Sequence, residues 1–259
     1  MFNEKYDLYL KAFNDYAAGY FSKLKTTPAL LKESMEYSFS SGGKRIRPVL
    51  VLEFCKMFGG TEEQAMPAAA AIEMIHTFSL IHDDLPAMDD DDMRRGRPSC
   101  HKAFPEALAI LAGDAMSIHA FSVLANSTAL SDAQKVRLIA ELAEESGHHG
   151  MIAGQVLDME QEGRADVTVD QLKTMCAFKT GALIRVACRM GCIAANATDE
   201  QIKAADTYGS YLGLAFQIVD DILDVTSTTD VLGKPVGSDA EENKVTFVTL
   251  LGLEAAQKE

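Results

Sequence analysis

The sequence predicts an all-α protein. Alanine, leucine, methionine, glutamate and lysine recur at spacings of three and four residues, which place side chains on one face of a helix. Short runs that alternate β-branched and polar residues, which would indicate strands, are nearly absent. With 259 residues, of which 47% are hydrophobic, the chain can bury a large core. Because no low-complexity linker divides it, we expect a single domain over residues 1–259.

Glycine pairs, prolines and an acid-rich loop separate the helical segments. The expected helices, in chain order, cover about residues 3–24, 29–40, 46–58, 64–84, 103–125, 131–162, 169–195, 199–226 and 240–257. Thr61 and Gln64 have the spacing of a capped helix start, but Pro67 is tolerated only in a first turn. We therefore expect the fourth helix to begin later, nearer Pro67.

Composition excludes several classes of protein. The formal net charge of -14 argues against a nucleic-acid binder, because phosphate backbones are held by an excess of lysine and arginine. The first residues are polar and do not resemble a signal peptide, and Glu73 and His76 interrupt the most apolar segment. We therefore predict a cytoplasmic protein without a membrane span. The five cysteines show no paired zinc spacing and are expected to be reduced thiols.

One acidic run dominates the charge pattern. Six carboxylates lie between Asp83 and Asp92, and Arg94, Arg95 and Arg97 follow directly. Clustered carboxylates repel one another, so they either point apart into solvent or share a cation, for which Asp supplies oxygen ligands. The arginines could hold an anion such as a phosphate by forked hydrogen bonds. A solvated acidic loop is the alternative for such a run in isolation.

A second acidic cluster lies inside an otherwise apolar helix. Asp220 and Asp224 are one helical turn apart on one face, and Asp221 lies to the side. Like charges at that spacing destabilise a helix unless something compensates them, although the cluster could also face solvent. Two such clusters facing each other across a cavity would bind Mg²⁺, which usually completes its coordination with water and substrate phosphate. The expected ligand is a diphosphate.

Basic residues occur next to these clusters. Gly42 and Gly43 precede Lys44 and Arg47 at a helix start, where backbone N–H groups also attract anions. Lys179 lies in mid-helix, where a surface lysine is the more frequent alternative, and Lys234 lies in the loop after the second cluster. His76 lies two turns before Asp83 on the same helical face, where a satisfied core histidine is the alternative. Adjacent histidines at 148 and 149 point about 100° apart and are not expected to bind metal.

Taken in order, these motifs resemble the short-chain trans-isoprenyl diphosphate synthases, most closely the bacterial farnesyl diphosphate synthases. The segments that carry the resemblance are 42–48, 83–96, 150–158, 179–181, 217–224 and 233–234, together with Lys244 and Thr246. The resemblance implies the isoprenoid synthase fold, with helices around a deep central cavity, in a homodimer. It also leads us to expect more helix after Gly252, so the C-terminal helices of the domain are expected to be missing or shortened.

The resemblance also implies a role for each motif residue. It implies about three Mg²⁺ ions per site, bound by Asp83, Asp89, Asp220 and Asp224, with Asp84 and Asp221 nearby. The allylic diphosphate would be held by Arg94, Lys179, Thr180, Gln217 and Lys234. Isopentenyl diphosphate would be held in a metal-free pocket by Lys44, Arg47, His76 and Arg95. The residues expected to be catalytic are Asp83, Asp89, Lys179 and Asp220.

The implied reaction is a head-to-tail condensation of isopentenyl diphosphate with dimethylallyl and then geranyl diphosphate, giving farnesyl diphosphate. Phe78 lies five residues before Asp83, where a bulky ring would form the floor of the cavity for the growing chain, although a plain core role is compatible with this position. Geranyl or geranylgeranyl diphosphate synthase is the alternative. Further alternatives are a class I terpene cyclase, a non-catalytic subunit of a heteromeric synthase, and an acidic interaction protein.

Overall fold

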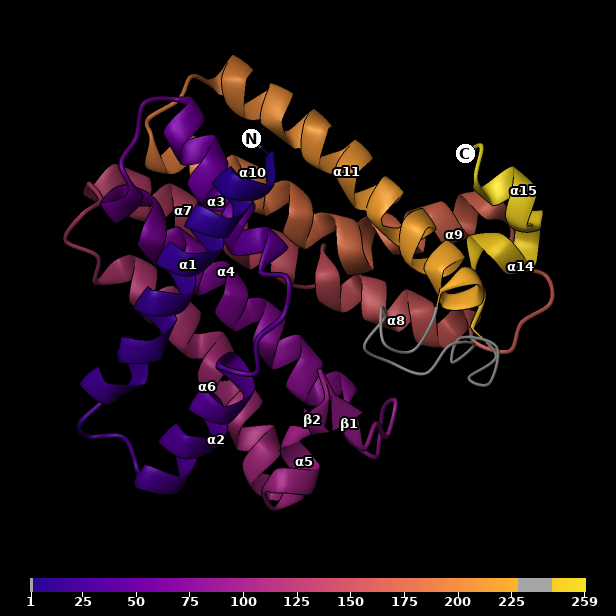
Figure 1. Ribbon diagram of the computed structural model, residues 1–259, viewed down its shortest axis with the longest axis horizontal. Coiled ribbons are helices and arrows are strands. Elements are labelled where there is room, and N and C mark those ends of the chain that lie inside the picture. Colours follow the sequence, from indigo (N-terminus) through magenta and orange to yellow (C-terminus); the bar gives the residue numbers. More distant parts are fainter. Residues whose placement is uncertain (1, 228–243) are drawn as a thin grey trace. The chain divides into compact units, whose positions relative to one another are not determined.

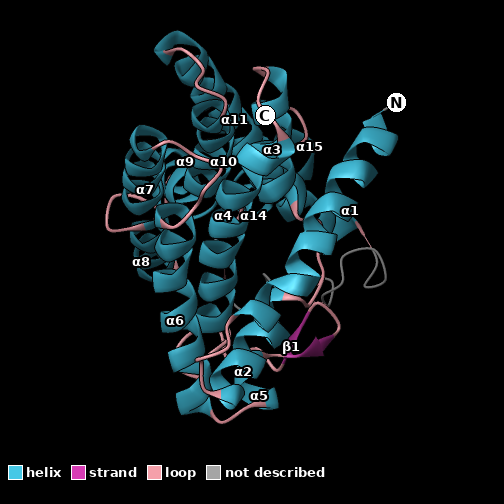
Figure 2. Cartoon of the chain, turned by 90° about the vertical axis from the view of Figure 1, so that its left-hand side faces the viewer, coloured by secondary structure: helices cyan, strands magenta, loops and turns pink. Residues whose placement is uncertain are grey.

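The computed structural model describes residues 2–227 and 244–259 and confirms the all-α prediction (Figure 1). Helices account for nearly all of the regular structure in these residues (Figure 2). The N-terminal helices are α1 (Phe2–Tyr20), η1 (Phe21–Lys23), α2 (Ala29–Phe39), α3 (Ile46–Met57), α4 (Glu62–Asp83), α5 (Cys100–Ala103) and α6 (Glu106–Ala125). They are followed by α7 (Asp132–Ser146), α8 (Met151–Gln161), α9 (Val169–Cys176), η2 (Ala177–Gly181), α10 (Ala182–Ala194), α11 (Asp199–Thr226), α14 (Phe247–Leu251) and α15 (Leu253–Ala256).

A short hairpin follows the first acidic run and was not predicted. Strands β1 (Met93–Arg94) and β2 (Arg97–Pro98) pair in antiparallel fashion, with Arg94 opposite Arg97. The turn residues Arg95 and Gly96 have φ angles of 53° and 75°. Two central residues with positive φ are typical of the tight turns that join twisted strands. With two residues in each strand, the hairpin is too short for a detectable alternating pattern.

Helix α4 begins at Glu62, so the prediction of a start nearer Pro67 was wrong. Thr61 and Gln64 form a complete capping box: the Thr61 hydroxyl accepts a hydrogen bond from the Gln64 N–H, and the Gln64 side chain accepts one from the Thr61 N–H. These bonds satisfy the first orphan donors of the helix. Pro67 therefore lies inside the helix.

Four of the predicted helices are interrupted. Pro105 forces the preceding Phe104 into an extended conformation, which separates α5 from α6. A turn ending at Gly150 separates α7 from α8, and the π-helical turn η2 separates α9 from α10. Gly252, with a φ of 80°, separates α14 from α15, and residues 240–243 of the last predicted helix lie outside the described residues. The prediction of one unbroken helix over 199–226 is confirmed.

The contacts divide the chain into two compact units, and the prediction of a single domain stays a prediction. Unit 1 comprises Met1–Ala140 and Ala187–Ile202, and unit 2 comprises Glu141–Val186 and Lys203–Glu259. In unit 1, α4 packs against α3 and α6, and its residues 68–71 are alanines without exposed surface. Gly113 of α6 lies against the His82 ring, and a side chain there would collide with it. Small residues thus bring α4 and α6 close together.

The most apolar long helix is α6, and not the segment over residues 64–84 on which the membrane prediction was based. Among the described residues, Glu106–Ala125 is one helix that is long and apolar enough, by length and composition alone, to cross a membrane. The prediction had rested on residues 64–84 as the most apolar segment. A helix of a protein core passes the same test, and the buried side of α6 packs on α4.

Unit 2 has its own hydrophobic core. The core includes Leu172 and Cys176 of α9, Ile218 of α11 and Phe247 of α14. A side chain at Gly213 of α11 would come within 2.8 Å of the backbone of η2, so glycine is needed for this approach. All five cysteines of the chain are free and buried, in agreement with the prediction of reduced thiols.

Candidate active site

The first acidic run folds back on the C-terminal end of α4. Asp83 is the last residue of the helix, and the Asp89 N–H donates a hydrogen bond to the Asp83 carbonyl at 2.8 Å. Both aspartates are half-buried. This backbone hydrogen bond closes the loop between the two residues and brings the two predicted metal ligands of the motif close together.

Asp84, next to Asp83, forms an ion pair with Arg94. The Arg94 Nε donates to an Asp84 carboxylate oxygen at 2.8 Å, its Nη2 donates to the same oxygen, and Nη2 also donates to Asp91 at 2.7 Å. Burial raises the pKa of Asp84, and the Arg94 guanidinium opposes that shift. Arg94, predicted to bind the allylic diphosphate, thus contacts two carboxylates of its own motif.

The hairpin places Arg95 over the glycine turn before α3. Its guanidinium donates a hydrogen bond to the Gly42 carbonyl. Gly43, with a φ of 106°, lies so close that an added Cβ would be 2.6 Å from the Arg95 Cζ. The positive φ favours glycine here, and any side chain at this position would also displace the Arg95 guanidinium. This contact brings together the 42–48 and 83–96 motifs within unit 1.

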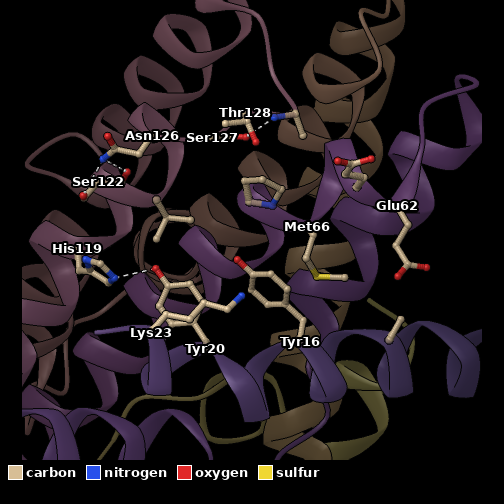
Figure 3. A pocket seen from close by; sticks show the side chains of 15 residues that line it. Tyr16, Tyr20, Lys23, Glu62, Met66, His119, Ser122, Asn126, Ser127 and Thr128 are labelled. Carbon is tan, nitrogen blue, oxygen red and sulfur yellow. Dashed lines mark hydrogen bonds between the residues drawn. The ribbon is translucent and has the colours of Figure 1, made fainter. Parts of the chain in front are cut away.

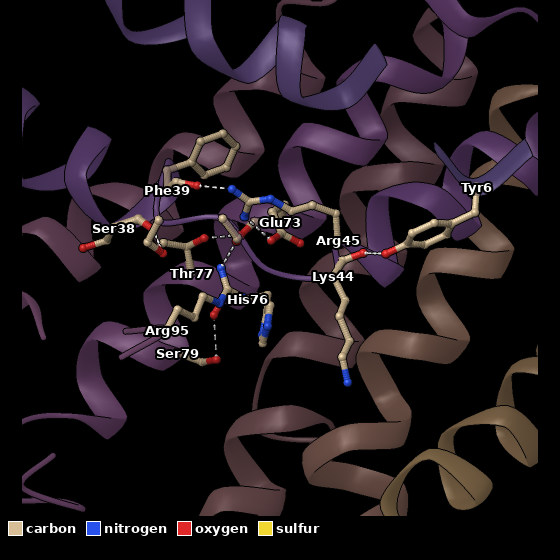
Figure 4. Close-up of polar contacts among 12 residues, drawn as sticks. Tyr6, Ser38, Phe39, Lys44, Arg45, Glu73, His76, Thr77, Ser79 and Arg95 are labelled. Atoms are coloured by element: carbon tan, nitrogen blue, oxygen red, sulfur yellow. Dashed lines mark hydrogen bonds and ion pairs between the residues drawn. The ribbon is translucent and has the colours of Figure 1, made fainter. Parts of the chain in front are cut away.

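Arg45 and Glu73 form a buried ion pair that the sequence did not reveal (Figure 4). The Arg45 Nη1 donates to Glu73 at 2.6 Å, and its Nη2 donates to the Phe39 carbonyl at 2.6 Å. Glu73 is only 1% exposed, and Arg45 has a φ of 47°. The available signal was Glu73 itself, because a buried carboxylate in an alanine-rich helix needs a cation. The pair is electrically neutral, so it adds no net charge to the cations beside it.

Arg47, His76 and Arg95 lie close enough to influence one another electrostatically, and we call this group of residues the His76 pocket. The pKa of His76 is lowered well below its ordinary value by burial and by the nearby guanidinium groups, first Arg47 and then Arg95. The pKa of Arg47 is lowered to about 10 by burial and by Arg95, against the influence of Glu73. The buried Arg47 Nε has no hydrogen-bond partner among the described residues. The charge of a bound anion would oppose both of these pKa shifts.

Two other predicted residues lie in the same unit. Lys44 has an exposed side chain, which Figure 4 shows extending away from Arg45, and its carbonyl accepts a hydrogen bond from the Tyr6 hydroxyl. Phe78 lies on α4 between His76 and Asp83 and is half-buried. Its ring meets the His82 ring edge-on, with centroids 5.6 Å apart.

Unit 2 contains the second set of predicted residues. Lys179 lies in the π-helical turn η2, a type of distortion that is frequent at functional sites. Its ammonium group forms an ion pair with Asp158 of α8. Gly154 of α8 contacts the backbone of Lys179 so closely that a side chain would collide with it. The glycine of the 150–158 motif therefore positions η2 against α8.

A chain of hydrogen bonds connects Thr180 to the second acidic cluster. The Thr180 hydroxyl donates to Gln217 at 2.9 Å, and the Gln217 amide donates to Asp221 at 2.9 Å. The other Asp221 oxygen accepts the N–H of Phe247 at 2.8 Å. Asp221 is thereby fixed between α11 and the start of α14.

These groups surround a cavity of about 190 Å³ in unit 2, which we call the Lys179 cavity. Its polar lining residues are Asp158, Lys179, Gln217, Asp220, Asp221, Lys244 and Thr246. Asp224 is only 1% exposed and is not among the lining residues. Lys234 lies outside the described residues. The sequence prediction gave no role to Asp158, Lys244 or Thr246, although each belongs to a motif of the resemblance.

A larger cavity in unit 1, of about 1040 Å³, contains none of the predicted residues. It lies beside the N-terminal part of α4, where Tyr16 and Met66 contribute to its lining (Figure 3). The Tyr20 hydroxyl and the His119 Nε2 share a hydrogen bond of 2.7 Å at its wall. With neither acidic cluster nor guanidinium groups in its lining, this cavity is not a candidate diphosphate site.

Comparison with known proteins agrees with these motifs. The polyprenyl synthetase family model matches residues 28–259. The chain is 48% identical over 232 residues to a chloroplastic geranylgeranyl pyrophosphate synthase of Catharanthus roseus, covering 89% of this chain and 65% of that protein. It is 46% identical over 233 residues to the farnesyl diphosphate synthase of Geobacillus stearothermophilus, covering 89% of this chain and 78% of that protein. This chain thus spans just under two thirds of the length of the plant relative.

A solved structure shows the same fold. The geranyltransferase of Helicobacter pylori, in complex with magnesium and isoprenyl diphosphate, superposes with a TM-score of 0.87 at 33% identity. The match covers 98% of this chain and 84% of that one. The isoprenoid synthase fold expected from the resemblance is confirmed, and the chain belongs to the polyprenyl synthetase family.

Proposed function

We propose that the protein is a Mg²⁺-dependent prenyltransferase that condenses isopentenyl diphosphate with dimethylallyl and geranyl diphosphate, head to tail, to give farnesyl diphosphate. The observation that carries the proposal is the His76 pocket. Its guanidinium groups can bind an anion without help from a metal, whereas Asp83 lies about two turns further along α4 and Asp89 follows the end of that helix. A condensation of two diphosphates needs a metal-free pocket of this kind, whereas a terpene cyclase does not.

The carboxylates fit divalent magnesium. Asp83 and Asp89 offer half-buried oxygens joined through a backbone hydrogen bond, and Asp220 lines the Lys179 cavity. Hard oxygen donors with open positions for water and phosphate are what Mg²⁺ prefers. We propose that Asp83, Asp89, Asp220 and Asp224 hold these ions on the allylic diphosphate. When bound, Mg²⁺ supplies Lewis-acid stabilisation of the negative charge that develops on the leaving diphosphate.

The other proposed roles concern binding and position. Lys179 and Thr180 hold the allylic diphosphate, because their ammonium and hydroxyl groups lie at or next to the same cavity as Asp220. Arg47 and Arg95 hold isopentenyl diphosphate, so that its double bond attacks the allylic cation that remains after the diphosphate has left. The new carbon–carbon bond places positive charge on the isopentenyl unit. Loss of a proton from that unit restores a double bond, and the released diphosphate accepts the proton.

A product assay tests the proposal. The protein is incubated with isopentenyl and dimethylallyl diphosphates in the presence of Mg²⁺ or EDTA, and products are identified by mass. We expect condensation with Mg²⁺ and none with EDTA. Asp83→Asn should lose nearly all turnover, while Asp114→Asn, which changes an exposed aspartate of α6, should retain it. Absence of any condensation product with Mg²⁺ would disprove the proposed activity for this chain.

The length of the product is proposed from Phe78, because the similar proteins include synthases of both farnesyl and geranylgeranyl diphosphate. Both farnesyl and geranylgeranyl synthases are similar to this chain at 45–48% identity. We predict that Phe78→Ala lengthens the product by removing a ring five residues before Asp83 on α4. The product distribution, measured with radiolabelled isopentenyl diphosphate, should shift beyond the C15 product. Phe58→Ala, the same truncation at the C-terminal end of α3, is the control and should leave chain length unchanged.

We also propose a homodimer. Ile110, Leu111 and Ile118 form an exposed apolar stripe on α6, and Ile118 is 71% exposed in the isolated chain. A second copy of the chain would bury this stripe. Light scattering after size exclusion should give twice the chain mass, and Ile118→Glu should give the monomer. Met57→Glu, at a residue that is 59% exposed at the end of α3, should remain dimeric.

A further inference from the structure

Three side chains converge at the base of the hairpin, outside the residues assigned to either diphosphate. Asp90 and Asp92 precede β1, and His101 follows β2 at the start of α5. One ligand atom from each of the three lies within 4.8 Å of the other two. The hairpin brings them together, because the Ser99 N–H donates to the Asp92 carbonyl at 2.9 Å across its open end.

His101 is oriented as a ligand. Its side chain is only 3% exposed, yet its Nε2 has no hydrogen-bond partner among the described residues. The Nε2 lies 3.8 Å from an Asp90 carboxylate oxygen. The other ring nitrogen, Nδ1, lies 3.1 Å from the hydroxyl of the buried Ser99. If Nδ1 carries the proton and donates to Ser99, the Nε2 lone pair points to the carboxylates, as in metal-ligating histidines.

We propose that Asp90, Asp92 and His101 form a binding site for a first-row divalent transition ion such as Zn²⁺ or Co²⁺. Imidazole nitrogen suits these ions, whereas Mg²⁺ prefers oxygen ligands only. Ligand atoms that each lie about 2.1 Å from one ion are about 3 to 3.5 Å from one another. The Asp90–His101 distance of 3.8 Å is close to this range, and both aspartate side chains are exposed, so that they can rotate toward an ion.

Lys102 competes for the same carboxylates. Its Nζ lies 2.8 Å from Asp92 and 3.9 Å from Asp90. A divalent ion brings two positive charges in place of this single one, and it also binds the His101 nitrogen. Binding of the metal would therefore replace the ion pair between Lys102 and Asp92. It shares no ligand with Asp83 and Asp89.

The ion would fix the base of the hairpin. Arg94 and Arg95 occupy the end of β1 and the turn, so their positions depend on how the two ends of this segment are held. The metal would thus be structural and would hold the two arginines in place. Its binding does not depend on the proposed reaction, because no diphosphate takes part.

Titration of metal-free protein with Co²⁺, in the absence of any diphosphate, tests the site. We expect one ion per chain with visible d–d absorption, which reports nitrogen and oxygen ligands directly. His101→Gln and Asp92→Asn should each weaken binding by about tenfold or more. Asp91→Asn is the matched control in the same loop, since it removes the same charge from a residue that contacts Arg94 instead. Circular dichroism confirms that each variant is folded.

Two further variants distinguish ligation by His101 from misfolding and from binding at Asp83 and Asp89. Lys102→Met should bind Co²⁺ more tightly than the wild type, a gain that misfolding cannot produce. The double variant Asp83→Asn, Asp89→Asn should bind Co²⁺ as the wild type does. The proposal is overturned if His101→Gln binds normally, if Asp91→Asn weakens binding as much as Asp92→Asn, or if the double variant abolishes the absorption.

Discussion

The His76 pocket and the Lys179 cavity both contain cations, but their charge balance is opposite. In the His76 pocket, the buried Arg45–Glu73 pair is neutral, and Arg47 and Arg95 remain as excess positive charge. The pKa values of His76, Arg47 and Arg95 are all lowered, first by burial and then by neighbouring guanidinium groups, while Glu73 opposes the shift of the two arginines. The pocket is therefore prepared to bind an anion directly.

In the Lys179 cavity, acids outnumber bases. Asp158, Asp220 and Asp221 line it together with Lys179 and Lys244. The Lys179 ammonium already contacts Asp158, so its charge is largely compensated. A diphosphate would meet net negative charge there unless divalent cations enter with it. The difference between the two regions explains why one proposed substrate would bind without metal and the other only with Mg²⁺.

The largest expected effect is on stability and comes from the buried Arg45–Glu73 ion pair beside the His76 pocket. Arg45→Met leaves Glu73 buried without its cation, which should lower the free energy of unfolding by about 3–5 kcal/mol. Lys179→Met removes the cation that pairs with Asp158. Because this ion pair is partly exposed, the substitution should lower the free energy of unfolding by about 1 kcal/mol or less. Urea denaturation measures both.

A double variant identifies the cause of the Arg45 effect. Arg45→Met combined with Glu73→Met removes both charges and should recover most of the lost stability. If the double variant is as unstable as Arg45→Met alone, packing of the arginine rather than the stranded carboxylate is responsible. The contrast between the two regions would then not rest on charge.

The next effect concerns affinity for isopentenyl diphosphate in EDTA. Arg47→Gln removes a half-buried guanidinium from the pocket and should weaken binding by about 2 kcal/mol, or about 30-fold, as for a hydrogen bond to a charged group. Lys179→Gln should leave this metal-free binding unchanged. Isothermal titration calorimetry measures both dissociation constants. Equal losses in the two variants would contradict the separation of the two regions.

Much of the site was predictable because its signals are local in sequence. Aspartates at the end of an apolar helix and cations after a pair of glycines are visible without a structure. The residue pattern alone does not separate Arg45 from Arg47, and only the resemblance distinguished Arg47. The pairing of Arg45 with Glu73 needed the structure, because the two residues are far apart in the sequence.

The fold was predictable to a similar degree and for similar reasons. The 28-residue helix α11 follows from unbroken periodicity. The π-helical turn around Lys179 does not, because it arises where Gly154 and Gly213 let neighbouring helices approach the backbone of η2. The pairing of Asp84 with Arg94 also depends on a hairpin with two residues per strand, which leaves no periodic signal.

The smallest expected effect is the pH dependence that His76 confers. Its pKa in the folded protein is well below the ordinary value of about 6.5, so the unfolded chain binds a proton that the folded protein does not. Stability should therefore fall as pH drops below about 6.5, by about 1.4 kcal/mol per pH unit. Thermal unfolding between neutral pH and pH 5.5 should show this loss in the wild type and a smaller one in His76→Asn.

A bound diphosphate sharpens the test, because its charge would raise the pKa of His76 and remove part of the acid-induced loss. His119 is the matched control. Burial also lowers its pKa, but it lines the cavity of about 1040 Å³ beside the N-terminal part of α4. His119→Asn should reduce the acid-induced loss with or without isopentenyl diphosphate. If the diphosphate changes the pH dependence of His76→Asn as much as that of the wild type, His76 does not sense the anion, and the excess charge of the pocket must be assigned to Arg47 and Arg95 alone.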